Sequence, residues 1–293
     1  MGYKSPKAIA QAGIETGATK ARLSWDKALV AGFLAGAYIA IAGLLAITVS
    51  AGMPERIWGT LPTFFTGAVF SLGLILVIVA GSELLTGNMA LVPLAAMTGR
   101  ASARKLTENW AFVLVGNLLG ALFVAYFLGV QTGVLTAELP LDRLAAIATK
   151  KGIEETEWQI FLRALGCNWL VCLGVWMALA AEDVAGKILA IFFPIMAFVA
   201  LGFDHVVANM FFIPAAIFAG VPELTWWDAV HNWIFAFLGN VVGATIFVAG
   251  AYWFLYARRT LEEPGDTPSG APERGGDSGR RETSSPRAAA RRR

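Results

Sequence analysis

Two stretches of this chain, Gly81-Ser-Glu-Leu-Leu-Thr-Gly-Asn-Met-Ala-Leu-Val-Pro93 and Gly202-Phe-Asp-His-Val-Val-Ala-Asn-Met-Phe-Phe-Ile-Pro214, repeat one polar phrase inside apolar sequence. In each, an acid is followed by an Asn-Met pair, a β-branched residue and a proline at the same spacing, and the copies lie 121 positions apart. A second echo follows at nearly the same shift, Gly116-Asn-Leu-Leu-Gly-Ala121 against Gly239-Asn-Val-Val-Gly-Ala244. Matched halves with interrupted apolar helices are typical of transport pathways through membranes.

Composition places the chain in a bilayer. Of its 293 residues 57% are hydrophobic and only 15% charged, and the mean hydropathy is +0.62. A soluble protein of this length carries more charge. The apolar runs are long enough to predict six membrane spans. They cover 28–52, 61–98 (interrupted), 109–130, 160–181, 187–219 (interrupted) and 231–257.

Lysine and arginine predict the orientation of these spans. With the N-terminus inside, the segments expected outside hold only Arg56, Arg143, Lys150 and Lys151, whereas the inner segments hold the remaining loop and tail cations. Cytoplasmic segments carry this excess. We therefore expect a multi-pass protein of the cell (inner or plasma) membrane with both termini cytoplasmic. Residues 1–27 would form a cytoplasmic amphipathic helix that starts at Ser5-Pro6, 28–257 the channel, and 258–293 a disordered tail rich in Pro, Gly, Ser, Arg and Glu.

The interruptions matter because unpaired backbone groups are not tolerated in hydrocarbon. Unwound backbone at membrane depth survives only where protein buries it or where it lines a cavity. Each interruption is followed by an apolar half-helix, expected to begin near Asn88 or Asn209. The free N–H groups and positive dipole ends of two such half-helices would attract a small anion at the membrane centre.

Three ionisable residues fall inside the interruptions, and such residues are functional candidates in a membrane. Glu83 and Asp204 hold matched positions, so we expect them to accept N–H groups of the unwound loops or to pair with a residue near the membrane face. His205 has no such mate, because Leu84 stands at its repeat position. This departure from internal symmetry favours a functional role for His205.

Other classes of function fit less well. The basic residues follow topology, so no nucleic-acid partner is expected, and Cys167 and Cys172 are expected to be packing residues on one helix. No metal site or cofactor is predicted. A membrane enzyme could use Glu83, Asp204 and His205 for acid–base chemistry, but no nucleophile motif or phosphate loop accompanies them. A water or glycerol channel would be expected to carry paired Asn-Pro-Ala motifs.

The chain resembles the formate/nitrite transporter family. The resemblance rests on the two interruptions, together with Cys167-Asn-Trp-Leu-Val-Cys-Leu173 and Gly239-Asn-Val-Val-Gly243. These motifs come in the family's order, and the resemblance covers about residues 5–257. The resemblance implies an all-α integral membrane protein with six transmembrane helices. Its aquaporin-like inverted 3+3 repeat would have broken second and fifth spans. It also implies a homopentamer in which each protomer has its own anion pore.

The resemblance also implies roles for single residues. His205 matches the central pore histidine and Thr86 its partner, while Asn168 and Asn240 match polar positions near the pathway. The family's lysine before the fourth span falls at Lys150 or Lys151, between which the spacing does not decide. Two positions depart from the formate channels compared: Leu85 replaces an aromatic and Asp204 replaces Glu. The apolar constrictions of the family fall at Phe70, Leu74, Leu85 and Phe198.

Among small monovalent anions, the resemblance favours formate, with nitrite or hydrosulfide as the alternative and acetate and lactate as further candidates. The mechanism stays open at this point. In one version His205 passes a proton to the anion and transport is proton-coupled. In the other, His205 supplies only electrostatics and the anion takes its proton from water.

Overall fold

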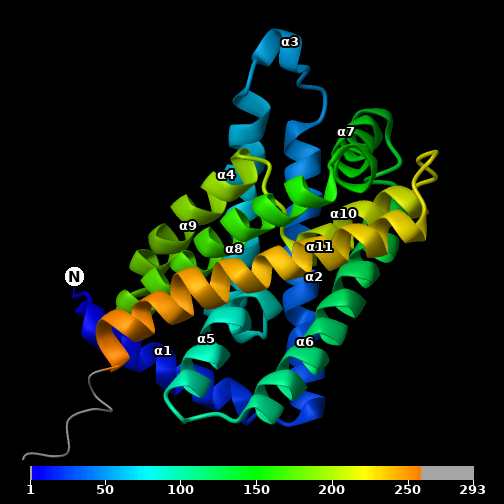
Figure 1. The fold of residues 1–293 in the computed structure, drawn as a ribbon. Helices are drawn as coiled ribbons and strands as arrows, with labels where there is room; N and C mark the ends of the chain where they lie inside the picture. The colour runs from blue at the N-terminus through cyan, green and yellow to red at the C-terminus, as the bar shows by residue number, and fades with distance from the viewer. Residues whose placement is uncertain (1, 259–293) are drawn as a thin grey trace, which may run out of the picture. The chain divides into compact units, whose positions relative to one another are not determined.

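A computed structural model describes residues 2–258, and these are helical apart from turns, short connections and one isolated β-bridge between Tyr3 and Ala181 (Figure 1). The expected tail, 258–293, lies outside the described residues except for Arg258. The helices are α1 Pro6–Ala21, α2 Trp25–Ser50, α3 Glu55–Trp58, α4 Leu61–Leu76, α5 Leu85–Met97, α6 Ala103–Phe123, α7 Glu138–Thr149, α8 Glu157–Ala180, α9 Val184–Ala200, α10 Val206–Phe218 and α11 Trp226–Ala244. The π-helical turns are η1 Val77–Gly81, η2 Val124–Val130, η3 Lys150–Glu154, η4 Thr245–Gly250 and η5 Trp253–Ala257.

Five continuous helical segments in the described chain are long and apolar enough to cross a bilayer: Trp25–Ser50, Leu61–Gly81, Ala103–Val130, Glu157–Ala180 and Trp226–Ala257. The apolar run at 187–219, which was expected to be interrupted, is divided between the shorter helices α9 and α10. Much of the outer surface is apolar as well. On α6, for example, the exposed large side chains are Phe112, Val115, Leu119 and Phe123. A surface of this kind is typical of contact with lipid or with a neighbouring subunit.

Both interruptions are real breaks in the helical backbone. Gly81 and Gly202 end the two preceding segments with φ of +83° and +71°, a conformation that glycine adopts without steric cost. After a short extended stretch, α5 begins at Leu85 and α10 at Val206. The half-helices therefore start three residues before the asparagines near which we expected them. Pro93 and Pro214 lie inside them.

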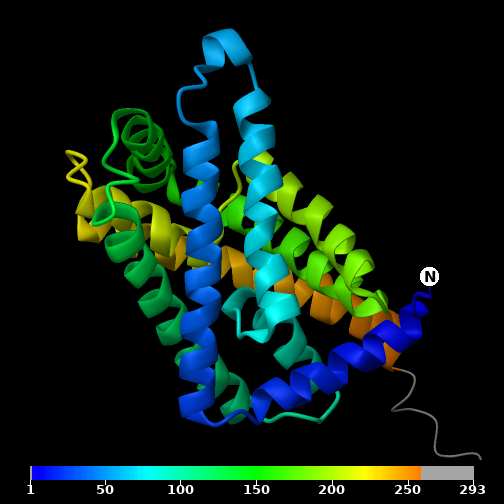
Figure 2. The same ribbon diagram turned by 180° about the vertical axis from the view of Figure 1, so that it is seen from behind.

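The two halves pack in the same way. Helix α2 lies along α6, and α8 lies along α11 (Figures 1 and 2). Glycine makes this possible, because a Cβ on Gly120 would collide with the carbonyl oxygen of Phe33, and one on Gly243 with that of Leu165. The second sequence echo thus records two equivalent helix crossings in which backbones approach closely, as membrane helices commonly do.

Two helices that do not belong to the long segments lie at opposite ends of the bundle. Helix α1 crosses the end where α6 begins, and α7 with η3 lies at the other end, near α3 (Figures 1 and 2). We call these the α1 end and the α7 end. Ser5 caps α1 by accepting the N–H of Ala8, as the Ser5-Pro6 pair predicts. The sequence analysis did not anticipate α7 or η3.

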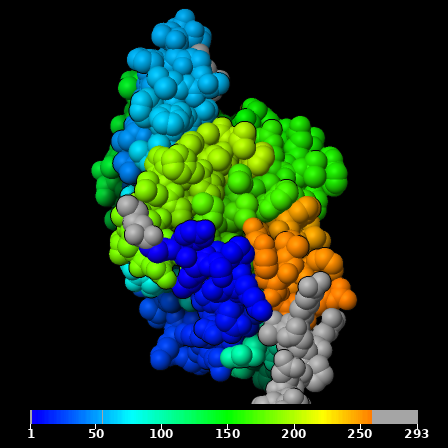
Figure 3. All heavy atoms as spheres, turned by 90° about the vertical axis from the view of Figure 1, so that its left-hand side faces the viewer, coloured from blue at the N-terminus to red at the C-terminus, as the bar shows by residue number. Residues whose placement is uncertain are grey.

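The surface view shows how these ends differ in shape. Helix α1 lies flat against its neighbours, whereas α3 and the adjoining ends of α2 and α4 stand above the rest of this face (Figure 3). The segment before α1 is attached to the end of α8, since the N–H of Lys4 donates to the carbonyl of Ala180.

Candidate functional site

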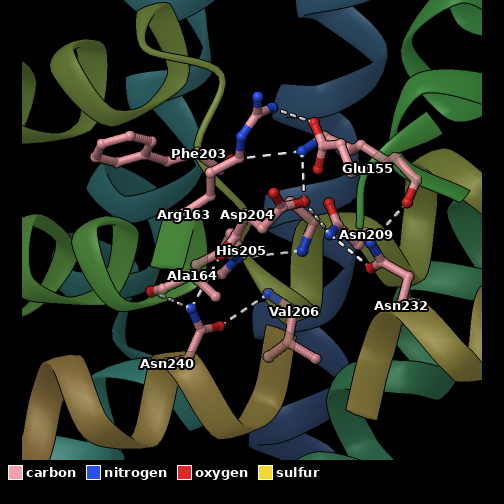
Figure 4. Close-up of polar contacts among 12 residues, drawn as sticks. Glu155, Arg163, Ala164, Phe203, Asp204, His205, Val206, Asn209, Asn232 and Asn240 are labelled. Carbon is pink, nitrogen blue, oxygen red and sulfur yellow. Dashed lines mark hydrogen bonds and ion pairs between the residues drawn. The ribbon is translucent and has the colours of Figure 1, made fainter. Parts of the chain in front are cut away.

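The second broken loop is held by a ring of four polar side chains. Lys151 Nζ, on η3, lies 2.7 Å from Asp204 Oδ1, to which Asn209 Nδ2 also donates at 2.8 Å. Asn209 Nδ2 further donates to Asn232 Oδ1 at 2.8 Å, and Asn232 Nδ2 closes the ring on the carbonyl of Lys151 at 3.0 Å. Figure 4 shows Asp204 between this asparagine pair and Glu155. The fully buried Asp204 carboxylate is thereby paired, which a charge at this depth requires.

The first broken loop carries the same ring. Lys20 Nζ, on α1, lies 2.8 Å from Glu83 Oε1, and Asn88 Nδ2 donates to Glu83 Oε2 at 2.8 Å. Asn88 Nδ2 also donates to Asn109 Oδ1 at 2.9 Å, and Asn109 Nδ2 donates to the carbonyl of Lys20 at 3.0 Å. Both acids thus pair with a lysine from the helical element at their own end of the bundle, α1 for Glu83 and η3 for Asp204. Sequence reasoning expected such a partner but did not identify Lys20.

A second pair of asparagines fixes the start of each half-helix. Asn117 Oδ1 accepts the N–H of Leu85 at 2.9 Å, and Asn240 Oδ1 accepts that of Val206 at 2.9 Å. Their amide groups donate to the carbonyls of Glu83 and Asp204, at 2.9 and 3.0 Å. Asn240 also reaches Ala164 (Figure 4). Asn240 therefore holds the backbone at the start of α10 and lines neither of the two cavities described below. The signal that could have identified Asn109 and Asn232 is their 123-position spacing, the same as that of Asn117 and Asn240.

His205 lies at the N-cap of α10 and touches the opposite half of the molecule. Its Nδ1 accepts the N–H of Ala208 at 3.1 Å, and its Nε2 lies 2.8 Å from Thr86 Oγ1. Because Nδ1 is an acceptor, a neutral ring carries its proton on Nε2 and donates it to Thr86. The threonine hydroxyl is then able to donate in turn. The sequence pairing of Thr86 with His205 thus corresponds to a direct contact between the two broken loops.

Asn168 lies behind this contact. Its amide donates to the carbonyl of Thr86 at 3.2 Å and to that of Asn240 at 2.9 Å, so from α8 it links the start of α5 to α11. Cys172 Sγ also lies within hydrogen-bond distance of the Thr86 carbonyl, at 3.3 Å. Both side chains, and that of Cys167, are buried. Asn168 therefore positions Thr86 and does not line either of the two cavities described next.

A cavity of about 100 Å³ reaches His205 from the α7 end. Its apolar wall includes Phe70, which meets Phe198 edge-on with ring centroids 6.0 Å apart and stacks on Phe212 at 6.3 Å. Lys151 and Asn209 also line it. Phe70 and Phe198 were expected at a constriction, whereas Phe212 was not.

A smaller cavity, of about 20 Å³, lies on the α1 side of the contact. Its lining repeats that of the first cavity at 121-position spacing, with Val77, Leu84 and Leu91 where the other has Phe198, His205 and Phe212. Leu74 lines this cavity, as expected of a constriction residue. Leu85 is buried but lines neither cavity, and Leu84 takes the place we had assigned to it.

The α7 end opens into a recess of about 600 Å³ whose wall includes both lysines left open by the sequence. Lys150 is exposed there, while Lys151 turns inward to Asp204. Glu155, in the connection between η3 and α8, is buried in the wall and forms an ion pair with Arg163. Burial, followed by the nearby Asp204 carboxylate, raises the pKa of Glu155 to about 7, against the opposing effects of Lys151 and Arg163.

The chemistry that these groups support is recognition of a small anion. Two half-helix N-termini, an imidazole N–H and a threonine hydroxyl meet between two apolar cavities, each with a lysine at its far side. Within residues 2–258 no group of three or more His, Cys, Asp or Glu side chains could hold a metal ion.

Comparison with known proteins agrees with this arrangement. The family model described as "Formate/nitrite transporter" matches residues 7–254. A protein of Methanothermobacter thermautotrophicus named "Probable formate transporter" is 47% identical over 87% of this chain and 98% of its own. The "Formate channel BtFdhC" of Bacillus thuringiensis is 43% identical over 88% and 98%.

A solved structure, "Pentameric formate channel with formate bound", has a similar fold, with a TM-score of 0.70 and 30% identity over 80% of this chain and 98% of its own. Together with the apolar helices, these matches identify a multi-pass membrane protein. The chain belongs to the formate/nitrite transporter family.

Proposed function

We propose that this chain is a channel for formate, with the His205–Thr86 contact at the centre of its pathway. The observation that carries the proposal is the 2.8 Å contact of His205 Nε2 with Thr86 Oγ1, between cavities that approach from opposite ends. Relatives named as formate channels and transporters favour formate as the anion. We assign no enzymatic role to the cluster.

The architecture that goes with this function has six spans in two inverted halves of three. The second span is α4 with η1 and α5, broken at 82–84, and the fifth is α9 with α10, broken at 201–205. Both termini would then be cytoplasmic in the cell's inner or plasma membrane, with the α1 end inside and the α7 end outside. The pentameric state of the solved relative favours a homopentamer with one pore per protomer.

An anion that enters from the α7 end first meets the recess with Lys150 and Lys151, which concentrates it by charge attraction. It then passes the aromatic constriction of Phe70 and Phe198, where water is removed. Beyond that point it reaches His205, Thr86 and the N-terminus of α10, whose N–H dipoles replace part of the lost hydration. Leu74 and Leu84 form the apolar passage to the α1 end.

Protonation of the anion makes this passage far easier, because a neutral acid loses little on leaving water and a charge loses much. A carboxyl group such as that of formic acid has a pKa of about 4. The Ala208 cap bears on the source of the proton, since charging the ring would place a proton on Nδ1 and break that hydrogen bond. The contacts therefore favour the version in which His205 stays neutral and the anion takes its proton from water.

Nitrite and hydrosulfide are the alternative substrates, because the same contacts suit any small monovalent anion. The measurement that separates them is uptake into proteoliposomes, with formate and nitrite compared in the wild type and in His205→Ala. The matched control is His231→Ala, the other histidine of the chain, which lies on α11 and pairs with Glu157.

We expect rapid formate uptake that collapses in His205→Ala and persists in His231→Ala. Nitrite or hydrosulfide uptake with little formate uptake would overturn the assigned substrate. No anion uptake above that of empty liposomes would overturn the channel itself. Formate uptake with proton movement in the wild type, but without it in His205→Gln, would favour the version in which the histidine passes the proton.

A further inference from the structure

Glu155 is a buried acid of the α7 end that has no equivalent at the α1 end. The N-cap residues Thr156 of α8 and Ser24 of α2 correspond in the repeat, which places Leu23 opposite Glu155 and Ala31 opposite Arg163. Glu155 is only 8% exposed. A buried carboxyl added to one half of a symmetric scaffold needs a physical reason, because burial of a charge is unfavourable unless it is paired.

Two carboxylate oxygens at this place lack a partner within the described residues. They are Glu155 Oε2 and Asp204 Oδ2, both buried, while the sister oxygens are taken by Arg163 and by Lys151 with Asn209. Glu155 and Asp204 are neighbours at the α7 end (Figure 4), and the Asp204 carboxylate acts on the pKa of Glu155. Two ionised carboxylates repel at this range, whereas one proton between them turns one oxygen into a donor and satisfies both.

We propose that Glu155 and Asp204 share one proton at the α7 end, and that this proton controls the charge an anion meets beside Lys151. The second part rests on the proposed channel function. Figure 4 shows the two acids facing each other, with Arg163 on the far side of Glu155. Asp204 alone was expected from the sequence. Glu155 thus becomes a positioning residue that acts through Asp204 and Lys151.

The charges around the pair set the sign of the effect. With the proton present, Lys151, Arg163 and Asp204 leave one net positive charge, and loss of the proton cancels it. The pKa of Glu155, about 7, places this change near neutral pH. Anion uptake from the α7 side is therefore helped below about pH 7 and weakened above it. The other charged or titratable groups on α7, η3, α8 and α11 and at the start of α10 are Glu138, Asp142 and Arg143 of α7, Lys150 and Glu154 of η3, Glu157, Cys167 and Cys172 of α8, Asp228 and His231 of α11, and His205.

The shared proton is tested without transport, by infrared titration of the purified protein. We expect a carboxylic-acid C=O band in the wild type that disappears as the pH rises through about 7, and that is absent in Glu155→Gln. Glu154→Gln, an exposed neighbour on the same wall, is the matched control and should keep the band. If Glu155→Gln does not fold, Glu155→Met replaces it. A wild type without a titrating band near neutral pH would overturn the shared proton.

Control of anion uptake is tested by the ratio of formate uptake in Glu155→Gln to that in the wild type, as the external pH is varied at fixed internal pH. The ratio removes the change in free formic acid, which is the same for both proteins. We expect a ratio near one at about pH 6 that rises about three- to tenfold by about pH 8, the effect of one unit charge in a partly solvated site.

A ratio that does not change with pH would overturn the control of uptake, even where the infrared band is present. Absence of formate uptake in the wild type would contradict the proposed channel function, while the infrared result would still decide the shared proton.

Discussion

The first and second broken loops are held by matching polar rings but are lined by different side chains. Lys20 and Glu83 at the α1 end correspond to Lys151 and Asp204 at the α7 end, and the supporting asparagines correspond as well. The pathway side differs, since Leu84 faces one cavity and His205 the other. Symmetry is thus kept where backbone and charge must be satisfied, and is lost where an anion would pass.

The physical reason lies in the cost of each error. An unpaired N–H group or carboxylate at membrane depth costs several kcal/mol, so both halves need the same solution. Side chains that face a cavity carry no such obligation. They are free to differ. Aromatic rings line the cavity at the α7 end, and smaller aliphatic groups hold the corresponding positions at the α1 end.

The largest effect is expected at the asparagines that start the half-helices. Asn240→Ala leaves the N–H of Val206 and the carbonyls of Asp204 and Ala164 without their partner, which should lower the free energy of unfolding by on the order of 5 kcal/mol. Asn117→Ala should cost a similar amount. Denaturation in mixed micelles measures both. A large loss in one variant only would break the equivalence of the two halves.

Removing the lysine of each ring should lower the free energy of unfolding by different amounts in the two halves. Lys151→Met leaves the fully buried Asp204 without its cation, and we expect a loss of about 3–5 kcal/mol in the free energy of unfolding. Lys20→Met should cost less, because the side chain of Glu83 is 11% exposed and is partly solvated. Thermal unfolding of both variants, with Lys150→Met as the exposed control, measures the difference. Equal losses would contradict the difference in burial.

Exchanging cavity residues should change selectivity, at a cost in stability because both side chains are buried. Phe198→Val gives the α7 cavity the residue of its repeat mate, Val77, and should raise acetate uptake relative to formate several-fold. Val77→Phe should slow both anions, because the cavity at that end already has the smaller volume. Competition uptake into proteoliposomes measures both ratios. An unchanged acetate-to-formate ratio in Phe198→Val would remove Phe198 from the constriction.

The smallest effect is expected at the helix caps. Thr156 takes part in a capping box with Gln159, whereas Ser24, its repeat mate, makes no side-chain capping bond to its helix. Thr156→Ala should therefore lower the free energy of unfolding by about 1 kcal/mol and Ser24→Ala by less. The same denaturation measurement compares them. A greater loss at Ser24 would show that its hydroxyl serves another contact.

The sequence predicted what repeats and what is apolar. The two interruptions and the acids needing partners were readable because each depends on local backbone chemistry or on spacing along the chain. The starts of the half-helices were placed three residues late, because Asn88 and Asn209 lie in the first helical turn and face the acids. Leu84 and Leu85 were confused, because a helix start fixes which of two neighbours faces a cavity.

The partners of the buried charges could not be predicted. Lys20 and Lys151 lie on helices that cross opposite ends of the bundle, and their distance to Glu83 and Asp204 depends on how those helices pack. The sequence could not decide between Lys150 and Lys151 for the same reason, since adjacent residues on a helix point in different directions and only the packing shows which one faces the acid. Glu155 and Arg163 lie outside the two interruptions and have apolar counterparts, Leu23 and Ala31, so the repeated polar phrase did not point to them.

By itself the sequence determined a repeated, apolar, interrupted chain and the residue types that an anion pathway needs, because hydropathy, spacing and glycine chemistry are properties of the chain alone. Only the tertiary structure decided that His205 meets Thr86 across the two halves, that each acid has its own lysine, and that Glu155 faces Asp204. These contacts join residues far apart in the chain, and their geometry is set by helix packing.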